Sequence, residues 1–300
     1  TCKNNFCTLN PLDYNSSTTA LSDGNLTLNA TSNNGAVYSA TYNVPNSGKY
    51  YFEFYEKVID VTTTNYISIN SVKDDSKYQQ YRGYGYIYTD GVQATGYATM
   101  AEGDLVGVGI DADLGKVSFY KNGTLVATVT SSSVDHVRGA KIRSYLPRGA
   151  GSYPPGDTRV FNFGQNPTFS GSLTAGTYTD SNGKGLFKYQ PPAGYLALCE
   201  DNLPTPAIAD PGKNFKTVLY TGDGNSGRSI TGLGFQPDFV WIKRRASSPQ
   251  AHALHDSVRG PTIHLESHSS DADESNNVYG ALNSFDNDGF SLSLGSGGGW

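Results

Sequence analysis

The chain has 300 residues, of which 37% are hydrophobic and 16% are charged, and its formal net charge is −5. The apolar fraction suffices for a core and argues against wholesale disorder. The acidic balance argues against a general nucleic-acid binder, which needs a basic stripe to displace counterions. No run of 18 apolar residues could cross a membrane as a helix, so we expect no membrane insertion.

The three cysteines are an odd count, and they are Cys2, Cys7 and Cys199. A secreted disulfide scaffold normally carries an even set, so we expect reduced thiols. A Cys2–Cys7 bridge or an interchain bridge is the alternative.

Short runs with period-two alternation recur along the chain and predict an all-β fold. "GKYYFEFYEKV" (48–58) and "YISINSV" (66–72) alternate clearly. "DLVGVGIDADLGKVSFYKNGTLVATV" (104–129) predicts three strands, the last two joined at Asn122-Gly123, because both residues tolerate positive φ. "TRVFNFG" (158–164) and "GYLALCE" (194–200) predict further strands, and no amphipathic helix is expected.

A tyrosine row lies in "YQQYRGYGYIYTDG" (78–91), where Tyr84, Tyr86 and Tyr88 recur at every second position. Side chains alternate along a strand, so we expect these rings on one strand face, packed against an opposite sheet. A ligand-binding platform is the alternative. Tyr81 and Arg82 before the row, and Tyr97 after it, are expected to project from loops and are candidate binding residues.

A linker is predicted at residues 201–215, which contain three prolines and show no periodicity. We therefore place one module at 1–208 and a second β-rich module at 209–300. The second module ends on "GSGGGW", an unusual domain end, so we expect it to be truncated.

Three pieces in order resemble the SPRY domain: "GKYYFEF", then "GDLVGVGIDADLGKVSFYKNG", then "RVFNFGQNPTF". The resemblance covers residues 48–208, and "ALSDGNLTLNAT" before it would complete the sandwich. It implies a two-sheet antiparallel β-sandwich of the concanavalin A-like kind, which binds proteins or glycans without catalysis. Residues 213–300 resemble modules of bacteriophage, particularly cyanophage, tail and appendage proteins.

Catalytic and metal-binding patterns are weak. Asp111 and Asp113 flank a predicted hairpin turn, in which aspartate bonds to the backbone. Four of the five histidines fall at residues 252–268, where solvated loop histidines are expected and a metal site is the alternative. No nucleophile elbow or phosphate-loop pattern is present. We therefore predict no catalytic residue, no metal and no cofactor.

A long loop at residues 143–159 joins two predicted strands and contains prolines, glycines, tyrosines and arginines. Prolines stiffen a loop, and tyrosine and arginine favour interfaces. Arg148 and Tyr153 are therefore candidate binding residues, although the loop could merely cover the sheet edge.

The combined resemblances imply a non-enzymatic virion appendage or tail-fibre component. Its expected partners are other virion or tail subunits, or a host-surface glycan or protein, within a homotrimeric parent assembly. A purely structural assembly module and a polysaccharide-degrading tail enzyme are the alternatives. The enzyme would need convergent carboxylates, which the sequence does not display.

Overall fold

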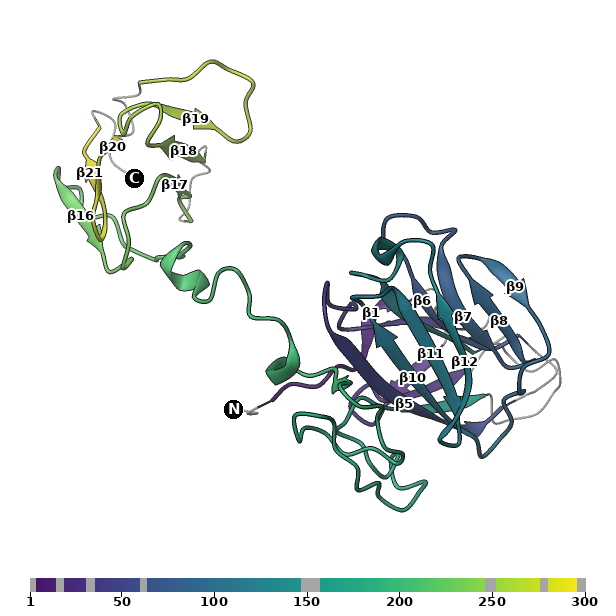
Figure 1. The fold of residues 1–300 in the computed structure, drawn as a ribbon. Coiled ribbons are helices and arrows are strands. Elements are labelled where there is room, and N and C mark those ends of the chain that lie inside the picture. The colour runs from purple at the N-terminus through teal and green to yellow at the C-terminus, as the bar shows by residue number, and fades with distance from the viewer. Residues whose placement is uncertain are drawn as a thin grey trace. The chain divides into compact units, whose positions relative to one another are not determined.

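The computed structural model describes residues 4–14, 19–30, 36–59, 64–146, 157–245, 252–275 and 280–295. The chain divides into two compact units, Thr1–Pro204 and Thr205–Trp300. Both are built from strands, as Figure 1 shows.

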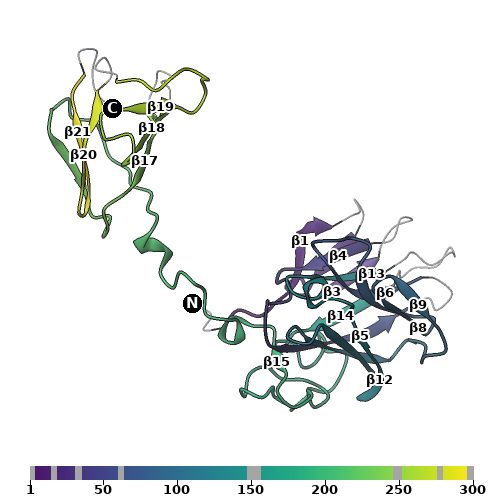
Figure 2. The ribbon, with the colours of Figure 1, turned by 45° about the horizontal axis from the view of Figure 1, so that its top comes forward.

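Two antiparallel sheets form the first unit and face each other across one core (Figures 1 and 2). The seven-stranded sheet has the order β1 (Leu9–Tyr14), β4 (Ala36–Ala40), β13 (Lys141–Leu146), β6 (Tyr66–Asn70), β7 (Tyr78–Arg82), β8 (Tyr86–Thr89) and β9 (Val92–Ala94). The eight-stranded sheet has the order β12 (Thr124–Thr130), β11 (Lys116–Lys121), β10 (Leu105–Asp111), β5 (Lys49–Val58), β14 (Thr158–Asn162), β3 (Thr27–Ala30) and β2 (Thr19–Ser22), with β15 (Leu196–Ala197) beside β5.

The central strand β5 is buried on both faces. Phe52 and Phe54 point into the core between the sheets, as the period-two pattern requires. Tyr51, on the opposite face, packs with Phe187 and Cys199 from the later part of the unit. The outer face of the eight-stranded sheet is therefore covered by residues that follow β14.

The Asn122-Gly123 turn joins β11 to β12 as expected. Asn122 and Gly123 have φ values of 49° and 81°, which suit a tight two-residue hairpin. The Asn122 side chain accepts from the backbone N–H of Leu105 at 2.8 Å and donates to Asp104 at 2.8 Å, which fixes the turn to β10.

Helical structure in the described residues consists of the short 3-10 turns η1 (Val134–His136), η2 (Glu200–Asn202) and η3 (Pro211–Lys213). The all-β expectation is therefore confirmed. One detail departs from it, because β15 pairs with β5 in parallel. Among the described residues, none of the helices has the length and apolar character needed to traverse a bilayer.

Two three-stranded sheets form the second unit (Figure 2). One has the order β16 (Arg228–Thr231), β21 (Gly289–Ser293) and β20 (Ala281–Asp286), and the other has the order β17 (Phe239–Ile242), β18 (Ala253–Asp256) and β19 (His264–Glu266). Val240 and Ile242 of the second sheet share a small core with Ile230, Leu282 and Phe290 of the first.

Candidate functional site

The outer face of the seven-stranded sheet carries an unusual density of tyrosine and arginine. Ile67, Ile69, Tyr81, Ile87 and Ile142 point into the core, so the residues between them on these strands point outward. The outward residues on β13, β6, β7 and β8 are Lys141, Arg143, Tyr145, Tyr66, Ser68, Asn70, Tyr78, Gln80, Arg82, Tyr86 and Tyr88. We call this set the tyrosine face.

One row of the tyrosine face runs straight across four strands. Tyr145 lies opposite Tyr66, Tyr66 opposite Arg82, and Arg82 opposite Tyr86. The rings of Tyr145 and Tyr66 stack with their centroids 5.1 Å apart. Directly opposed residues of neighbouring strands are close enough to make such contacts. The row is therefore a continuous strip of rings interrupted by one guanidinium.

Arg82 holds the centre of this strip. Its guanidinium carbon lies 4.2 Å from the ring centroid of Tyr88 and 6.0 Å from that of Tyr66. Its Nε donates to the side-chain oxygen of Gln80 at 2.5 Å. Such contacts limit the rotamers of a long side chain before any partner arrives, which reduces the entropy lost on binding.

The remaining tyrosines extend the face on both sides of Arg82. Tyr78 and Tyr88 have ring centroids 5.8 Å apart, and Tyr84 and Tyr86 have theirs 6.0 Å apart. The Tyr88 hydroxyl donates to Gln93 of β9 at 2.5 Å. Tyr66, Tyr78 and Tyr86 are half-buried, so part of each ring remains open to solvent.

The charge of the tyrosine face is positive although the chain is acidic. Its charged members are Lys141, Arg143 and Arg82, and no aspartate or glutamate occupies an outward position on these four strands. Asp13 of β1 pairs with Lys141 at 2.6 Å. Arg82 and Arg143 make no ion pair with a carboxylate among the described residues, so their charges are available to an anionic or acceptor-rich partner.

A buried ion pair supports the face from beneath. Arg159 of β14 and Glu56 of β5 are both fully buried, and they pair through two hydrogen bonds. Arg159 also reaches across the core, donating to the backbone carbonyl of Tyr66 at 3.0 Å and to the Ser144 hydroxyl at 2.8 Å. The strands that carry Tyr66 and Tyr145 are therefore tied to the opposite sheet directly below those rings.

Burial also affects the chemistry of the rings. Burial, together with the neighbouring Tyr145 ring, raises the pKa of the Tyr66 phenol above its usual value. The hydroxyl therefore stays protonated at neutral pH and can donate a hydrogen bond to a partner.

The predicted site residues fall in different places. Arg82 lies in the tyrosine face, as the last residue of β7 rather than in the expected loop. Tyr97 is half-buried and lines a depression of about 510 Å³ together with Lys121 and Leu125. Arg148 and Tyr153 lie outside the described residues. The expectation that Tyr81 projects from a loop is wrong. Tyr81 lies within β7 and is fully buried, and its hydroxyl donates to the carbonyl of Ala98 at 2.5 Å.

The expected single row of Tyr84, Tyr86 and Tyr88 is also wrong. Tyr84 lies in the turn between β7 and β8, because Gly83 and Gly85 turn the chain there. A Cβ at Gly85 would lie 2.2 Å from the Tyr97 carbonyl, so this close approach requires glycine. Ile87, rather than the tyrosines, points into the core, which places Tyr86 and Tyr88 on the outer face.

Sequence reasoning missed most of the tyrosine face. Tyr66 was not a candidate, although "YISIN" and "KIRSYL" both alternate polar and apolar residues. Arg143 and Tyr145 were expected in the loop at residues 143–159, and that expectation is wrong because both lie in β13. That alternation was the available signal. It identifies an outward face on each strand, but it does not reveal that β13 and β6 are neighbours.

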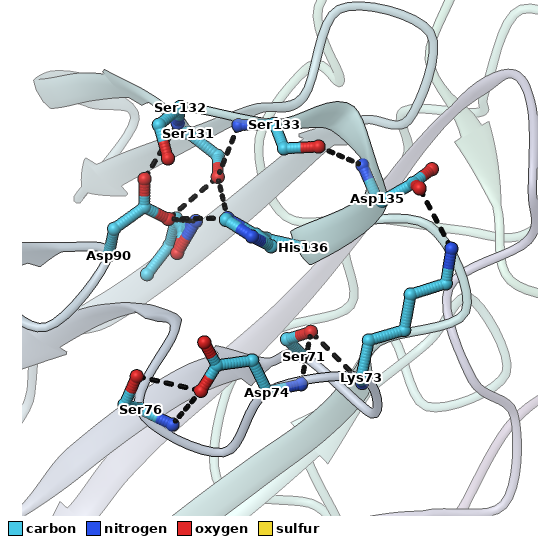
Figure 3. A network of polar contacts seen from close by, with 11 residues as sticks. Ser71, Lys73, Asp74, Ser76, Asp90, Ser131, Ser132, Ser133, Asp135 and His136 are labelled. Carbon is cyan, nitrogen blue, oxygen red and sulfur yellow. Dashed lines mark hydrogen bonds and ion pairs between the residues drawn. The ribbon is translucent and has the colours of Figure 1, made fainter.

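Serine, histidine and aspartate do meet at one point of the first unit, where the β8–β9 turn contacts the segment that follows β12 and leads into η1 (Figure 3). Asp90 accepts from the Ser131 hydroxyl at 2.6 Å and from the Ser132 backbone N–H at 2.6 Å. His136 Nδ1 contacts both Ser131 Oγ at 3.0 Å and Asp90 Oδ1 at 3.2 Å. A catalytic triad uses opposite ring nitrogens for serine and aspartate, whereas here Nδ1 of His136 contacts both. The cluster therefore holds two loops together and is not arranged as a triad.

The ionisation of Asp90 fits that structural role. Burial opposes its charge, but hydrogen bonds from Ser131, Ser132 and His136 outweigh burial and lower the pKa of Asp90 to about 2. The carboxylate is charged throughout the neutral range. It holds the β8–β9 turn against the segment that follows β12.

Two other aspartates bond to backbone N–H groups and so have a structural role. Asp111 Oδ1 accepts from the backbone N–H groups of Asp113 at 3.1 Å and Leu114 at 3.0 Å, which confirms the hairpin-turn prediction. Asp288, after β20, accepts from the N–H groups of Gly232 and Gly234 at 3.0 and 2.6 Å.

The expectation of solvated loop histidines is wrong for two members of the cluster. His255 and His264 lie in β18 and β19 and are buried, with ring centroids 5.3 Å apart. Burial and the neighbouring His264 lower the pKa of His255 to about 4, so it is neutral at physiological pH. Over the part of the chain that the structure describes, no group of three or more metal-ligating side chains is present.

Comparison with known families finds one match in each unit. Residues 49–139 match the model of the SPRY domain. Residues 210–299 match a domain of unknown function, DUF7483. No curated protein matches the chain. The all-β fold, with a SPRY-like sandwich followed by a second β-rich region, is therefore confirmed.

Several solved structures are similar to about half of this chain. The SPRY domain of human HERC1 is 20% identical over 51% of this chain and 96% of that chain, with a TM-score of 0.41. The TRIM65 PSpry domain is 12% identical over 52% of this chain and 92% of that chain, with a TM-score of 0.39. A human SPRY domain is 19% identical over 48% of this chain and 96% of that chain, with a TM-score of 0.35.

A SPRY domain is typically an interaction module rather than a catalyst. The family match therefore suggests that this unit binds protein partners.

Proposed function

We propose that this chain is a non-enzymatic binding component of a phage virion appendage or tail fibre, and that it binds through the tyrosine face. The observation that carries the proposal is the composition of that face. Tyrosine, asparagine and arginine on a rigid sheet are among the residues that antibody paratopes use, because they offer large contact area and adaptable hydrogen bonds at low entropy cost. The face also lacks carboxylates, so it suits a partner rich in acceptors or negative charge.

The virion context rests on the order of the modules. The match to the SPRY domain at 49–139 is followed by the match to a domain of unknown function at 210–299. Within the second, "FKTVLYTGDGNSGRSITGLGFQPDFVWIKRR" resembles phage appendage modules in its sequence. In this proposal the protein resides in the virion, as a homotrimer of the parent protein. Its partner is a host-surface protein or glycan, or a neighbouring virion subunit. Repetition around a symmetry axis would convert weak single contacts into strong attachment.

Binding rather than hydrolysis is favoured by the chemistry of the face. A glycosidase needs two carboxyl groups flanking the scissile bond. The outward positions of β13, β6, β7 and β8 supply cations, amides and phenols, but no such pair. A tail enzyme would have to use another surface.

The test compares adsorption of the purified, fluorescently labelled chain to cyanobacterial cells and to purified cyanophage particles. Arg82→Ala should weaken attachment about tenfold or more, since central arginines are frequent interface hot spots. Arg82→Lys should weaken it nearly as much, because lysine lacks the planar guanidinium that stacks on Tyr88.

Tyr178→Ala is the matched control, because Tyr178 is 46% exposed and lies outside the tyrosine face. Adsorption to cells supports host attachment, and adsorption to particles alone supports the assembly role. If the wild-type chain bound neither, or if Arg82→Ala bound as well as Tyr178→Ala, the tyrosine face would not be the site.

A further inference from the structure

The second unit exposes an apolar row that its own core does not use. Along β17, Val240 and Ile242 enter the core, whereas Phe239 and Trp241 are 53% and 59% exposed. Trp241 lies opposite Leu254 of β18, and Leu254 lies opposite Leu265 of β19. The row therefore crosses all three strands of one sheet on its outer side. Contiguous exposed apolar groups of this kind mark interaction surfaces.

The tryptophan in this row is held in place. Its indole Nε1 donates to Nδ1 of His252 at 2.9 Å, and the two ring centroids are 5.7 Å apart. A large ring that is already oriented loses little freedom when a partner covers it. Trp241 thus has the properties of an interface anchor.

The two edges of the same sheet carry opposite charge. β17 is one edge strand, and the exposed residues Lys243, Arg244 and Arg245 follow it directly. At the other edge, the segment after β19 returns and pairs Glu274 with His264 through two backbone hydrogen bonds of 2.9 Å. That segment carries Asp271, Asp273 and Glu274, which are exposed.

We infer that this sheet is an interface between copies of this chain, joined head to tail. The basic edge beside β17 of one copy meets the acidic edge beside β19 of the next, and the apolar row contributes the buried contact. A second copy is the occupant because both halves of the charge complementarity lie on one sheet. A heterologous, head-to-tail contact sets the basic edge of one copy against the acidic edge of the next. It closes into a ring where the rotation between copies allows closure and extends as a filament where it does not.

This interface is separate from the tyrosine face of the first unit, so the two can be tested independently. The first experiment measures the mass of the 300-residue chain by sedimentation velocity and light scattering over a concentration series. The wild type should associate as concentration rises, and Trp241→Ser should shift it to monomer. Val258→Ser is the matched control, because Val258 is 95% exposed but lies in the turn after β18, and it should associate like the wild type.

A charge exchange tests the direction of the contact. Lys243→Glu/Arg244→Glu/Arg245→Glu should be monomeric, and so should Asp271→Lys/Asp273→Lys/Glu274→Lys, because each variant has two edges of one sign. An equimolar mixture of the two variants should associate again, since every edge then finds an opposite charge. Added salt should weaken both the wild-type and the mixed assemblies.

Three results would overturn the inference. These are a wild-type chain that stays monomeric at every concentration, association that survives Trp241→Ser, and a mixture of the two charge variants that remains monomeric. If Arg82→Ala removed association and Trp241→Ser did not, copies would instead meet through the tyrosine face.

Discussion

Arg159 in one sheet donates through Nη1 to the backbone carbonyl of Tyr66 in the other, at 3.0 Å. The same guanidinium pairs with Glu56 and lies 4.3 Å from the ring centroid of Phe54. A charge that is fully buried persists only when it is paired and hydrogen-bonded. This contact links the core of the sandwich to β6, the strand that presents Tyr66 in the tyrosine face.

Removing Arg159 should destabilise the first unit severely. Arg159→Met leaves the Glu56 carboxylate buried without its partner, which typically costs about 3–5 kcal/mol. Urea unfolding of the variant measures the loss. The double variant Arg159→Met/Glu56→Leu should recover much of it, because no uncompensated charge remains. Equal losses in the single and double variants would contradict this account.

Adjacent residues of β8 should respond oppositely to truncation. Ile87 is 1% exposed in the core, so Ile87→Ala should lower stability by about 2–5 kcal/mol. Tyr86 is half-buried on the outer face, so Tyr86→Ala should cost about 1 kcal/mol or less. Thermal and urea denaturation distinguish the two. A larger loss of stability from Tyr86→Ala than from Ile87→Ala would contradict the placement of the Tyr86 ring on the outer face.

The hairpin between β11 and β12 should resist substitution at Gly123 for two reasons. Its φ of 81° is strained for any other residue, by about 1–2 kcal/mol. An added Cβ would also lie 2.7 Å from the ring of Tyr189. Gly103 has a φ of 88° and open space around it, so Gly103→Ala measures the cost of the positive φ alone, without a side-chain clash. Urea unfolding should show a larger loss for Gly123→Ala, and equal losses would exclude a role for the Tyr189 contact.

Acid should weaken the hydrogen bonds by which Asp90 holds the β8–β9 turn to the segment after β12. Its side chain is 11% exposed, and its pKa of about 2 in the folded protein lies below the ordinary value of 3.8. A lowered folded pKa contributes stability that is fully present above about pH 4 and is lost as pH falls toward 2, here about 2 kcal/mol. The difference in unfolding free energy between wild type and Asp90→Asn should therefore shrink over that window. Ser131→Ala should reduce the same pH-dependent part of the unfolding free energy. A difference between wild type and Asp90→Asn that stays constant with pH would contradict this role of Asp90.

Binding through the tyrosine face should depend on salt if its cations meet an anionic partner. Arg143→Ala should lower the association rate constant and change the dissociation rate constant less. The reason is that a charge at the rim of an interface acts mainly by steering the partner toward it. Surface plasmon resonance against immobilised cell envelope at increasing ionic strength measures both rates. Identical rates for wild type and Arg143→Ala at low salt would remove Arg143 from the site.

The candidate site could be predicted only in fragments. Arg82 was identified because it precedes a tyrosine-rich run, and it lies at the centre of the face. Tyr81 was misplaced because β7 continues to Arg82 and the turn begins only at Gly83, which leaves Tyr81 inside the strand with its ring in the core. A shift of one residue reverses the face to which a strand side chain points.

The amino-acid sequence by itself determined the β-strands, the Asn122-Gly123 turn and the resemblance of residues 48–208 to the SPRY domain. Period-two alternation and positive-φ turns are properties of a few consecutive residues, so they can be read locally. Only the tertiary structure decided which strands are neighbours. β13 inserts between β4 and β6 and brings Tyr145 against Tyr66, although these residues are far apart in the chain. Strand order depends on how all the apolar faces are buried together, and no local pattern records it.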